Sequence, residues 1–273
     1  MTFPNAHAKT QRREVIWISK RQWFFAALRL CVIFSLLSFS VAATAQTNTL
    51  SDAEIQGRQL AQQLCDARPT TNFTQTGVLQ IRDGKGVKIE YPFLVRTFVG
   101  PTDWSAIYQI IFTNHSSGLE GEGATIQHLG GQKTLYASFK RSSFETLSGS
   151  ANVLEPFANS DFWLCDLGLE FFHWPQQKVL PKTTNLKRGR EYTLLESTNP
   201  NPATNGYSRV RSWIDKESGG LLQAEAYDAK GEKLKEFWPK SFGKVNDQWQ
   251  VEEIQIRNVQ TDSRTRLVFD LKK

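Results

Sequence analysis

Apolar and polar positions alternate through most of the chain after residue 70. Val87, Ile89, Tyr91, Phe93 and Val95 alternate with mainly polar residues, which is the two-residue period of a half-buried β-strand. Similar runs occur at residues 79–81, 108–112, 135–139, 192–195, 210–214, 221–227, 234–238, 249–256 and 265–271. The pattern predicts about ten antiparallel strands, joined by short turns, in a sheet that curls and packs one face.

Glycines and one change of phase mark the breaks between these strands. Residues 83–86 and 228–231 each begin with Asp and end with Gly, which is typical of hairpin turns. Residues 118–123 are also rich in glycine but lack the lysine and the helix of a phosphate loop, so we interpret them as a turn. Within residues 249–256 the apolar positions change from odd to even, which predicts a β-bulge near Glu252 and Glu253.

The segment after residue 50 predicts a helix. Ser51 and Glu54 have the spacing of a capping box, in which each side chain bonds the backbone N–H of the other residue. Pro69 marks the end of the helix. Small and apolar residues recur between them at three- and four-residue spacing: Ala53, Gly57, Leu60, Ala61, Leu64 and Cys65. A stripe this narrow suits a helix that lies on a sheet, so we expect a mainly β (α+β) fold.

Residues 1–45 have the pattern of a secretory signal peptide. A basic stretch ends at Arg29, residues 30–42 are uncharged and mostly apolar, and Ala45 supplies the small side chain that signal peptidase accepts. We expect cleavage before Gln46 and export. The alternative is an uncleaved membrane anchor, but the apolar run is shorter than the ~20 residues that span a bilayer.

The positive charge of the chain belongs mainly to this leader. The whole chain has 33 Lys and Arg against 27 Asp and Glu, and residues 1–45 hold six of the basic residues but only one acidic residue. Residues 46–273, which we expect to form a single domain, therefore carry 27 basic and 26 acidic side chains. This balance lacks the basic surface that binds DNA or RNA, so we expect no nucleic acid partner.

No catalytic, cofactor or metal motif stands out in the sequence. The histidines after the leader, His115, His128 and His173, do not form an i, i+4 pair. A nucleophile elbow, a phosphate loop and a dinucleotide fingerprint are all missing. We therefore expect no enzyme, no cofactor and no metal site. The weakest alternative is a hydrolase that uses Asp161, Asp166 and His173.

Cys65 and Cys165 are the two cysteines that remain after the expected cleavage. Because export brings a protein into an oxidising compartment, an even number of cysteines predicts a disulfide between them. The alternative is two buried free thiols, since cysteine is among the most buried residue types.

An apolar segment without strand alternation lies within residues 157–174. It contains six aromatic residues: Phe157, Phe162, Trp163, Phe171, Phe172 and Trp174. Such a segment either crosses the core and buries its own side chains, or it lines a cavity for an apolar ligand. The narrow stripe of the first helix cannot cover ten strands, so we expect this helical and aromatic segment to cover the rest of the concave face.

Three short motifs resemble those of the LolA-like family of periplasmic proteins, which sort outer-membrane lipoproteins. Residues 159–162 (Asn-Ser-Asp-Phe), followed by Asp166 and Leu167, resemble the family signature GSDF…DL, with asparagine in place of the usual glycine. Residues 207–217 resemble the family's strand that ends in WIDKE. Residues 226–235 resemble its YD-x-KG hairpin.

This resemblance implies a curved, incomplete antiparallel β-barrel with helices on its concave face. It also implies a periplasmic carrier or binding protein for the acyl chains of lipids or lipoproteins, which exchanges them with an envelope transporter or an outer-membrane acceptor. The alternative is a non-catalytic interaction module of a cell-envelope transport complex, which would dock through the same sheet.

An acyl carrier needs a dry apolar hollow, because each buried methylene contributes about 0.8 kcal/mol. We expect aromatic and aliphatic strand residues to form its floor and the aromatic segment to form a movable cover. The floor comprises Tyr91, Phe93, Tyr108, Ile110 and Phe112, and the cover comprises Phe162, Trp163 and Leu167.

Overall fold

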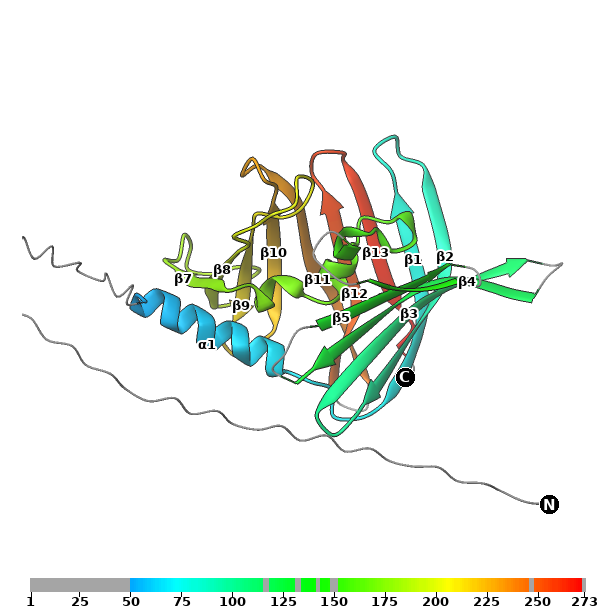
Figure 1. Ribbon diagram of the computed structural model, residues 1–273, viewed down its shortest axis with the longest axis horizontal. Coiled ribbons are helices and arrows are strands. Elements are labelled where there is room, and N and C mark those ends of the chain that lie inside the picture. The colour runs from blue at the N-terminus through cyan, green and yellow to red at the C-terminus, as the bar shows by residue number, and fades with distance from the viewer. Residues whose placement is uncertain are drawn as a thin grey trace, which may run out of the picture. The chain divides into compact units, whose positions relative to one another are not determined.

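The computed structural model describes residues 50–114, 118–130, 134–140, 143–147, 152–245 and 248–271. The leader, the expected cleavage before Gln46 and His115 lie outside these residues. The described strands form one antiparallel sheet in the order β6-β5-β4-β3-β2-β1-β13-β12-β11-β10-β9-β8-β7. The sheet curls but does not close, since β6 and β7 are its two ends (Figure 1). The expectation of a curved, incomplete antiparallel β-barrel is therefore confirmed.

The strands fall into two halves along the chain. The first half comprises β1 (Phe73–Arg82), β2 (Lys88–Val99), β3 (Asp103–Asn114), β4 (Gly118–Leu129), β5 (Thr134–Lys140) and β6 (Ser143–Leu147). The second half comprises β7 (Gln176–Leu180), β8 (Tyr192–Thr198), β9 (Arg209–Asp215), β10 (Leu221–Tyr227), β11 (Lys233–Val245), β12 (Gln248–Asn258) and β13 (Ser263–Phe269). The apolar pattern predicts ten of these 13 strands and misses β4, β6 and β7.

The turn expected at residues 118–123 is wrong, because these residues form the beginning of β4. Their glycines serve close packing within the sheet. Gly123 pairs with Gln109 of β3 and Phe139 of β5. A Cβ atom at Gly123 would lie only 2.1 Å from the Phe139 ring, so the ring needs a residue without a side chain beneath it.

Both Asp…Gly turns are confirmed and have the same construction. The carboxylates of Asp83 and Asp228 each accept hydrogen bonds from the backbone N–H groups two and four residues later, at 2.8–2.9 Å. Gly86 and Gly231 have φ angles of 89° and 81°, a backbone conformation that glycine adopts without steric cost.

The expected β-bulge is also confirmed. Val251 of β12 pairs with Phe242 of β11, and Glu253 pairs with the adjacent Ser241. Glu252 is therefore the extra residue of the bulge, as the change of phase predicts.

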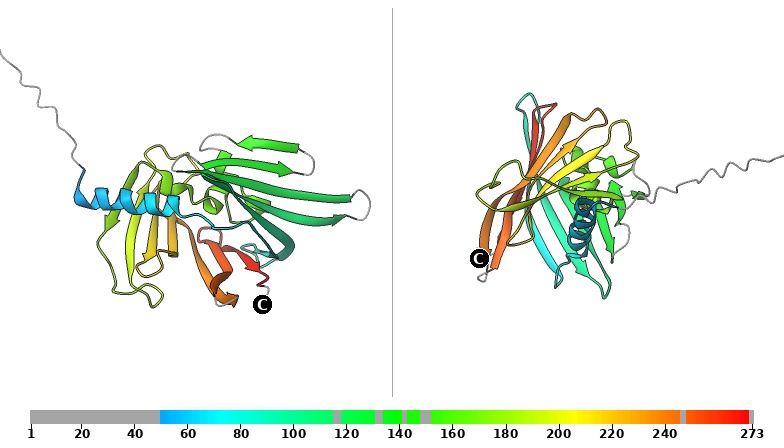
Figure 2. Two further views of the ribbon diagram at one scale, coloured as in Figure 1. Left: turned by 90° about the horizontal axis from the view of Figure 1, so that it is seen from below. Right: turned by 90° about the vertical axis from the view of Figure 1, so that its left-hand side faces the viewer.

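Helix α1 (Asp52–Asp66) confirms the expected amphipathic helix. Its first turn differs in detail, since Ser51 donates to the Glu54 carboxylate through both its N–H (2.8 Å) and its hydroxyl (2.6 Å). Gly57 and Ala61 are buried on the inner face of α1, which packs against β7 (Figures 1 and 2). A Cβ atom at Gly57 would lie 2.5 Å from the backbone nitrogen of Lys178, so glycine sets how closely helix and strand approach.

Short helices lie inside the curl of the sheet and cover the rest of its concave face (Figures 1 and 2). They are η1 (Asn152–Leu154), η2 (Phe157–Asn159), α2 (Leu164–Leu167) and η3 (Glu170–His173). Their side chains and those of the sheet form one hydrophobic cluster, which includes Phe93, Ile110, Phe157, Phe162, Phe171 and Ile256. The segment of residues 157–174 is thus part of the core.

Candidate ligand-binding site

Four of the five expected floor residues lie in this cluster. Phe93 and Ile110 pair across β2 and β3 and are each only 1% exposed. Tyr91 and Tyr108 are half-buried and pack against the same cluster. The backbone of Phe112 lies in β3, but its side chain lies outside the described set.

The expected cover residues lie in the same cluster as the floor. Phe162 is buried, and Trp163 and Leu167 are half-buried against it. The Trp163 ring stacks on the Tyr207 ring with 4.9 Å between their centres. The structure therefore brings floor and cover together, and the movement of the cover stays a prediction.

A buried polar network fastens α2 to the sheet. Asp166 of α2 and Lys235 of β11 form an ion pair (Nζ–Oδ2 3.4 Å) in which each side chain is 1% exposed. The Tyr207 hydroxyl donates to Asp166 Oδ1 at 2.8 Å. Lys235 Nζ also donates to the backbone oxygen of Asp161 at 2.7 Å and lies 3.3 Å from the centre of the Trp163 ring. Burial lowers the pKa of Lys235 despite the attraction of Asp166.

Asp161 anchors the same segment to β13. Its carboxylate accepts hydrogen bonds from the hydroxyls of Thr265 (2.9 Å) and Ser263, and its N–H donates to Thr265 Oγ1 at 3.0 Å. Burial raises the pKa of Asp161, although both hydroxyls favour the ionised form. The aspartates of the hydrolase alternative, Asp161 and Asp166, therefore both hold the cover on the sheet.

The sequence contains one signal for this network that pattern analysis overlooks. Lys235 stands two residues before Phe237 in β11, so strand alternation places both on the same face. Phe237 belongs to the core cluster, which means that a lysine points into the core and requires a buried partner. The partner itself, Asp166, is 69 residues away and could not be inferred from local pattern.

The predicted disulfide is wrong in this structure, since Cys65 and Cys165 are both free thiols. Cys65 lies in the last turn of α1, where its Sγ atom is 3.6 Å from His173 Nδ1. Cys165 is buried in α2. The physical reason is the packing, because α1 lies against β7 and η3, whereas α2 lies against η1, β4 and η3. Burial raises the pKa of the Cys65 thiol to about 11.

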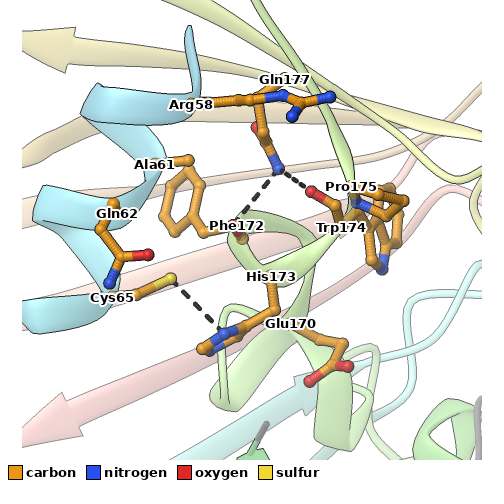
Figure 3. A pocket seen from close by; sticks show the side chains of 10 residues that line it. All are labelled: Arg58, Ala61, Gln62, Cys65, Glu170, Phe172, His173, Trp174, Pro175 and Gln177. Carbon is orange, nitrogen blue, oxygen red and sulfur yellow. Dashed lines mark hydrogen bonds between the residues drawn. The ribbon is translucent and has the colours of Figure 1, made fainter. Parts of the chain in front are cut away.

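A cavity of about 620 Å³ lies between α1, η3 and the beginning of β7 (Figure 3). Its lining comes from two segments more than 100 residues apart: Arg58, Ala61, Gln62 and Cys65 of α1, and Glu170, Phe172, His173, Trp174, Pro175 and Gln177. None of the expected floor or cover residues lines it. Two of the lining residues, Ala61 and Phe172, belong to the core cluster, so one wall of the cavity is the surface of the hydrophobic core.

A chain of hydrogen bonds leads from this cavity into the sheet. His173 Nδ1 contacts the Cys65 thiol, and His173 Nε2 lies 3.0 Å from the Thr134 hydroxyl. The same hydroxyl lies 3.5 Å from His128 Nδ1. Burial lowers the pKa of His173 and lowers the pKa of His128 to about 4. Both imidazoles are therefore neutral at pH 7, and each can accept a hydrogen bond from its hydroxyl or thiol neighbour.

In the part of the chain that the structure describes, no three His, Cys, Asp or Glu side chains gather as they would around a metal ion. No described helix has the length and apolar character needed to cross a bilayer.

Comparison with known proteins finds solved structures with a similar fold. No curated protein matches the sequence, and a family model described as "-like: Uncharacterized protein" matches residues 141–271. A DUF1329 family protein from Desulfovibrio piger is 19% identical with a TM-score of 0.64, over 81% of this chain and 92% of that chain.

Two further solved structures have a similar fold. A domain from Vibrio parahaemolyticus, named after outer membrane lipoprotein sorting, is 17% identical with a TM-score of 0.65, over 80% of this chain and 92% of that chain. A LolA superfamily protein from Nitrosomonas europaea is 15% identical with a TM-score of 0.54, over 81% and 93%. The chain has a LolA-like fold. At these identities the likeness concerns the fold, and it confirms the LolA-like resemblance of the sequence motifs at that level.

Proposed function

We propose that this protein is a periplasmic carrier that holds the acyl chains of lipids or lipoproteins between its concave sheet and its helical cover. In this proposal, residues 1–45 are a cleaved signal peptide and residues 46–273 form one LolA-like domain. The protein binds without catalysis and passes its ligand to an envelope transporter or an outer-membrane acceptor. The LolA-like fold supports this role, as does the name of the Vibrio parahaemolyticus domain, which refers to lipoprotein sorting.

One observation carries the proposal: the cavity beside α1 shares lining residues with a hydrophobic cluster that continues beneath the cover. Ala61 and Phe172 line the cavity and belong to the same cluster as Phe93, Ile110 and Phe162. In the proposed carrier, the side chains of this cluster move apart to form an apolar path from the cavity to the floor. An acyl chain that enters this path is stabilised by about 0.8 kcal/mol for each methylene removed from water. Release then requires only another apolar surface, with no nucleotide or metal.

Uptake of a fluorescent fatty acid such as 11-dansylundecanoic acid tests the proposal. We expect micromolar affinity for the wild-type protein, which corresponds to about 8 kcal/mol. Phe162→Glu should weaken uptake at least about tenfold, because it places a carboxylate in the apolar path. Phe98→Glu is the matched control, since Phe98 is 47% exposed and lies on the opposite face of β2 from the buried Thr97.

The circular dichroism spectrum of each variant shows whether it has kept the fold. A second measurement, native mass spectrometry of the protein released from the periplasm, should find bound lipid. A wild-type protein that takes up no acyl probe and carries no lipid would contradict the carrier. A non-catalytic docking module of an envelope transport complex would then be the better assignment.

A further inference from the structure

The cavity of Figure 3 holds one cationic group without a fixed partner. Within the described part of the chain, the Arg58 guanidinium makes no hydrogen bond and no ion pair. Glu54, one turn earlier in α1, attracts Arg58 through its charge, but its hydrogen bonds go to the N–H and the hydroxyl of Ser51. The donors of Arg58 therefore remain available to a ligand in the cavity that Arg58 helps to line (Figure 3).

Other polar side chains of the cavity already have partners in the protein. The Gln177 amide donates to the backbone oxygens of Phe171 and Trp174, each at 2.9 Å. His173 is held by Cys65 and Thr134. The Glu170 carboxylate accepts the Tyr136 hydroxyl at 2.8 Å. Among the ionic groups of the cavity, Arg58 is thus the cation whose hydrogen-bond donors have no acceptor in the described part of the chain.

Apolar side chains form part of the lining of the same cavity. Ala61 lies one turn further along α1 and is 3% exposed, and Phe172 is 5% exposed. Both belong to the core cluster, and the half-buried Trp174 packs against it. A ligand with its charged end on Arg58 would therefore lay its apolar part over Ala61 and Phe172, toward the hollow of the proposed carrier. The volume of about 620 Å³ is within the range of pockets that bind small molecules.

We propose that this cavity is the head-group site for a single-chain lipid with an anionic head, a carboxylate or a phosphate. The planar guanidinium of Arg58 suits either group, since it can donate two parallel hydrogen bonds to their oxygens. This inference rests on the proposed function and specifies the ligand: an acidic amphiphile whose head stays at the α1 side while its chain enters the hydrophobic interior.

Ligands that share one chain and differ in the head test the assignment. Palmitate carries a carboxylate, palmitoyl lysophosphatidic acid carries a phosphate, and hexadecanol has the same chain length without charge. We expect the wild-type protein to bind both acids at least about tenfold more tightly than hexadecanol. Arg58→Gln should remove this preference and leave hexadecanol binding unchanged, and Arg58→Lys should restore part of it.

Arg96→Gln is the control for loss of a positive charge, because Arg96 is an exposed arginine of β2 outside the cavity. It should leave all three affinities unchanged. Millimolar inorganic phosphate should not displace palmitate, and displacement would indicate a site for free anions and overturn the lipid assignment.

The failure of this inference differs from the failure of the proposed function. If palmitate and hexadecanol bind equally well and Arg58→Gln changes neither affinity, the head-group site is wrong and the acyl carrier stands. If the wild-type protein binds none of the three compounds, the carrier itself is wrong. Arg58 is exposed on α1, so its substitution should leave the circular dichroism spectrum unchanged.

Discussion

Helix α1 and the segment around α2 both cover the concave face, but different forces hold them there. Around α2, the buried charges of Asp166 and Lys235 and the hydroxyl of Tyr207 fix the cover through directed contacts. Helix α1 depends on close packing at Gly57 and Ala61, with a weak thiol–imidazole contact at its end. The cavity lies beside α1. We therefore expect the ligand of the proposed carrier to enter beside the packed helix, while the anchored segment keeps its place on the sheet.

The largest effect is expected from a substitution that breaks the ion pair between α2 and β11. Lys235→Met leaves the Asp166 carboxylate buried without its cation, and loss of one partner from a buried ion pair costs about 3–5 kcal/mol. We expect a decrease of that size in the free energy of unfolding, measured by urea denaturation. Lys240→Met is the control, because Lys240 forms its ion pair with Glu253 at a partly exposed site, where a pair contributes about 1 kcal/mol or less. Equal losses in the two variants would contradict the role given to the buried anchor.

Lowering the pH should destabilise the folded protein through His128. Burial lowers the pKa of His128 from its usual 6.5 to about 4, so between these values the unfolded chain binds more protons than the folded protein. The free energy of unfolding therefore falls as the pH is lowered from 6.5 toward 4. The full decrease is about 3 kcal/mol, at roughly 1.4 kcal/mol for each pKa unit.

His128→Phe separates this effect from the titration of carboxylates. The His128 ring stacks on Trp104 with 4.0 Å between centres, and phenylalanine preserves that contact. Urea denaturation at several pH values should give the variant a shallower loss of stability below pH 6.5. Identical pH dependence in the two proteins would show that His128 is not the titrating group.

A methyl group at Gly57 tests the packing of α1. Gly→Ala inside a helix ordinarily stabilises by up to about 1 kcal/mol. Here the new Cβ would approach the Lys178 backbone to 2.5 Å, and overpacking of this kind costs about 1–3 kcal/mol. We expect Gly57→Ala to lower the thermal midpoint, and Gln59→Ala, on the exposed face of α1, to leave it unchanged or raise it. If Gly57→Ala raised the thermal midpoint, α1 would have to lie farther from β7 than the structure shows.

Thiol labelling compares the environments of Cys65 in α1 and Cys165 in α2. In the unreduced, denatured protein, both Cys65 and Cys165 should react with a maleimide. In the folded protein, Cys65 should react slowly, because its pKa is raised to about 11, and the buried Cys165 should not react. Absence of label on the denatured chain would indicate a disulfide and bring α1 against α2.

Local sequence pattern accounts for much of the fold and for less of the site. The turns at Gly86 and Gly231, the stripe of α1 and ten strands follow from neighbouring residues alone. Strand β4 could not be predicted, because Gly123 makes room for Phe139, which lies in another strand. The shared hydrophobic cluster of most floor and cover residues could be predicted, since apolar residues of a curled sheet and its cover pack together; their role in binding stays a prediction.

The cavity and the anchors depend on pairs that only the folded chain brings together. Arg58 and Trp174 line one cavity although more than 100 residues separate them, and Asp166 finds Lys235 across 69 residues. The disulfide prediction failed for the same reason, because the compartment and the number of cysteines do not determine which face of a helix each thiol occupies. His173, which the sequence suggests only as part of a weak hydrolase, is instead the partner of Cys65.

The position of a bound acyl chain tests the central claim most directly. A crystal structure of the protein with palmitate brominated at its methyl end would locate both ends of the ligand, through the anomalous signal of bromine and the density of the carboxylate. We predict bromine inside the curl, among Phe93, Ile110 and Phe162, and the carboxylate on Arg58. Bromine on the convex face, or its absence from a hollow filled by the protein's own side chains, would contradict the account.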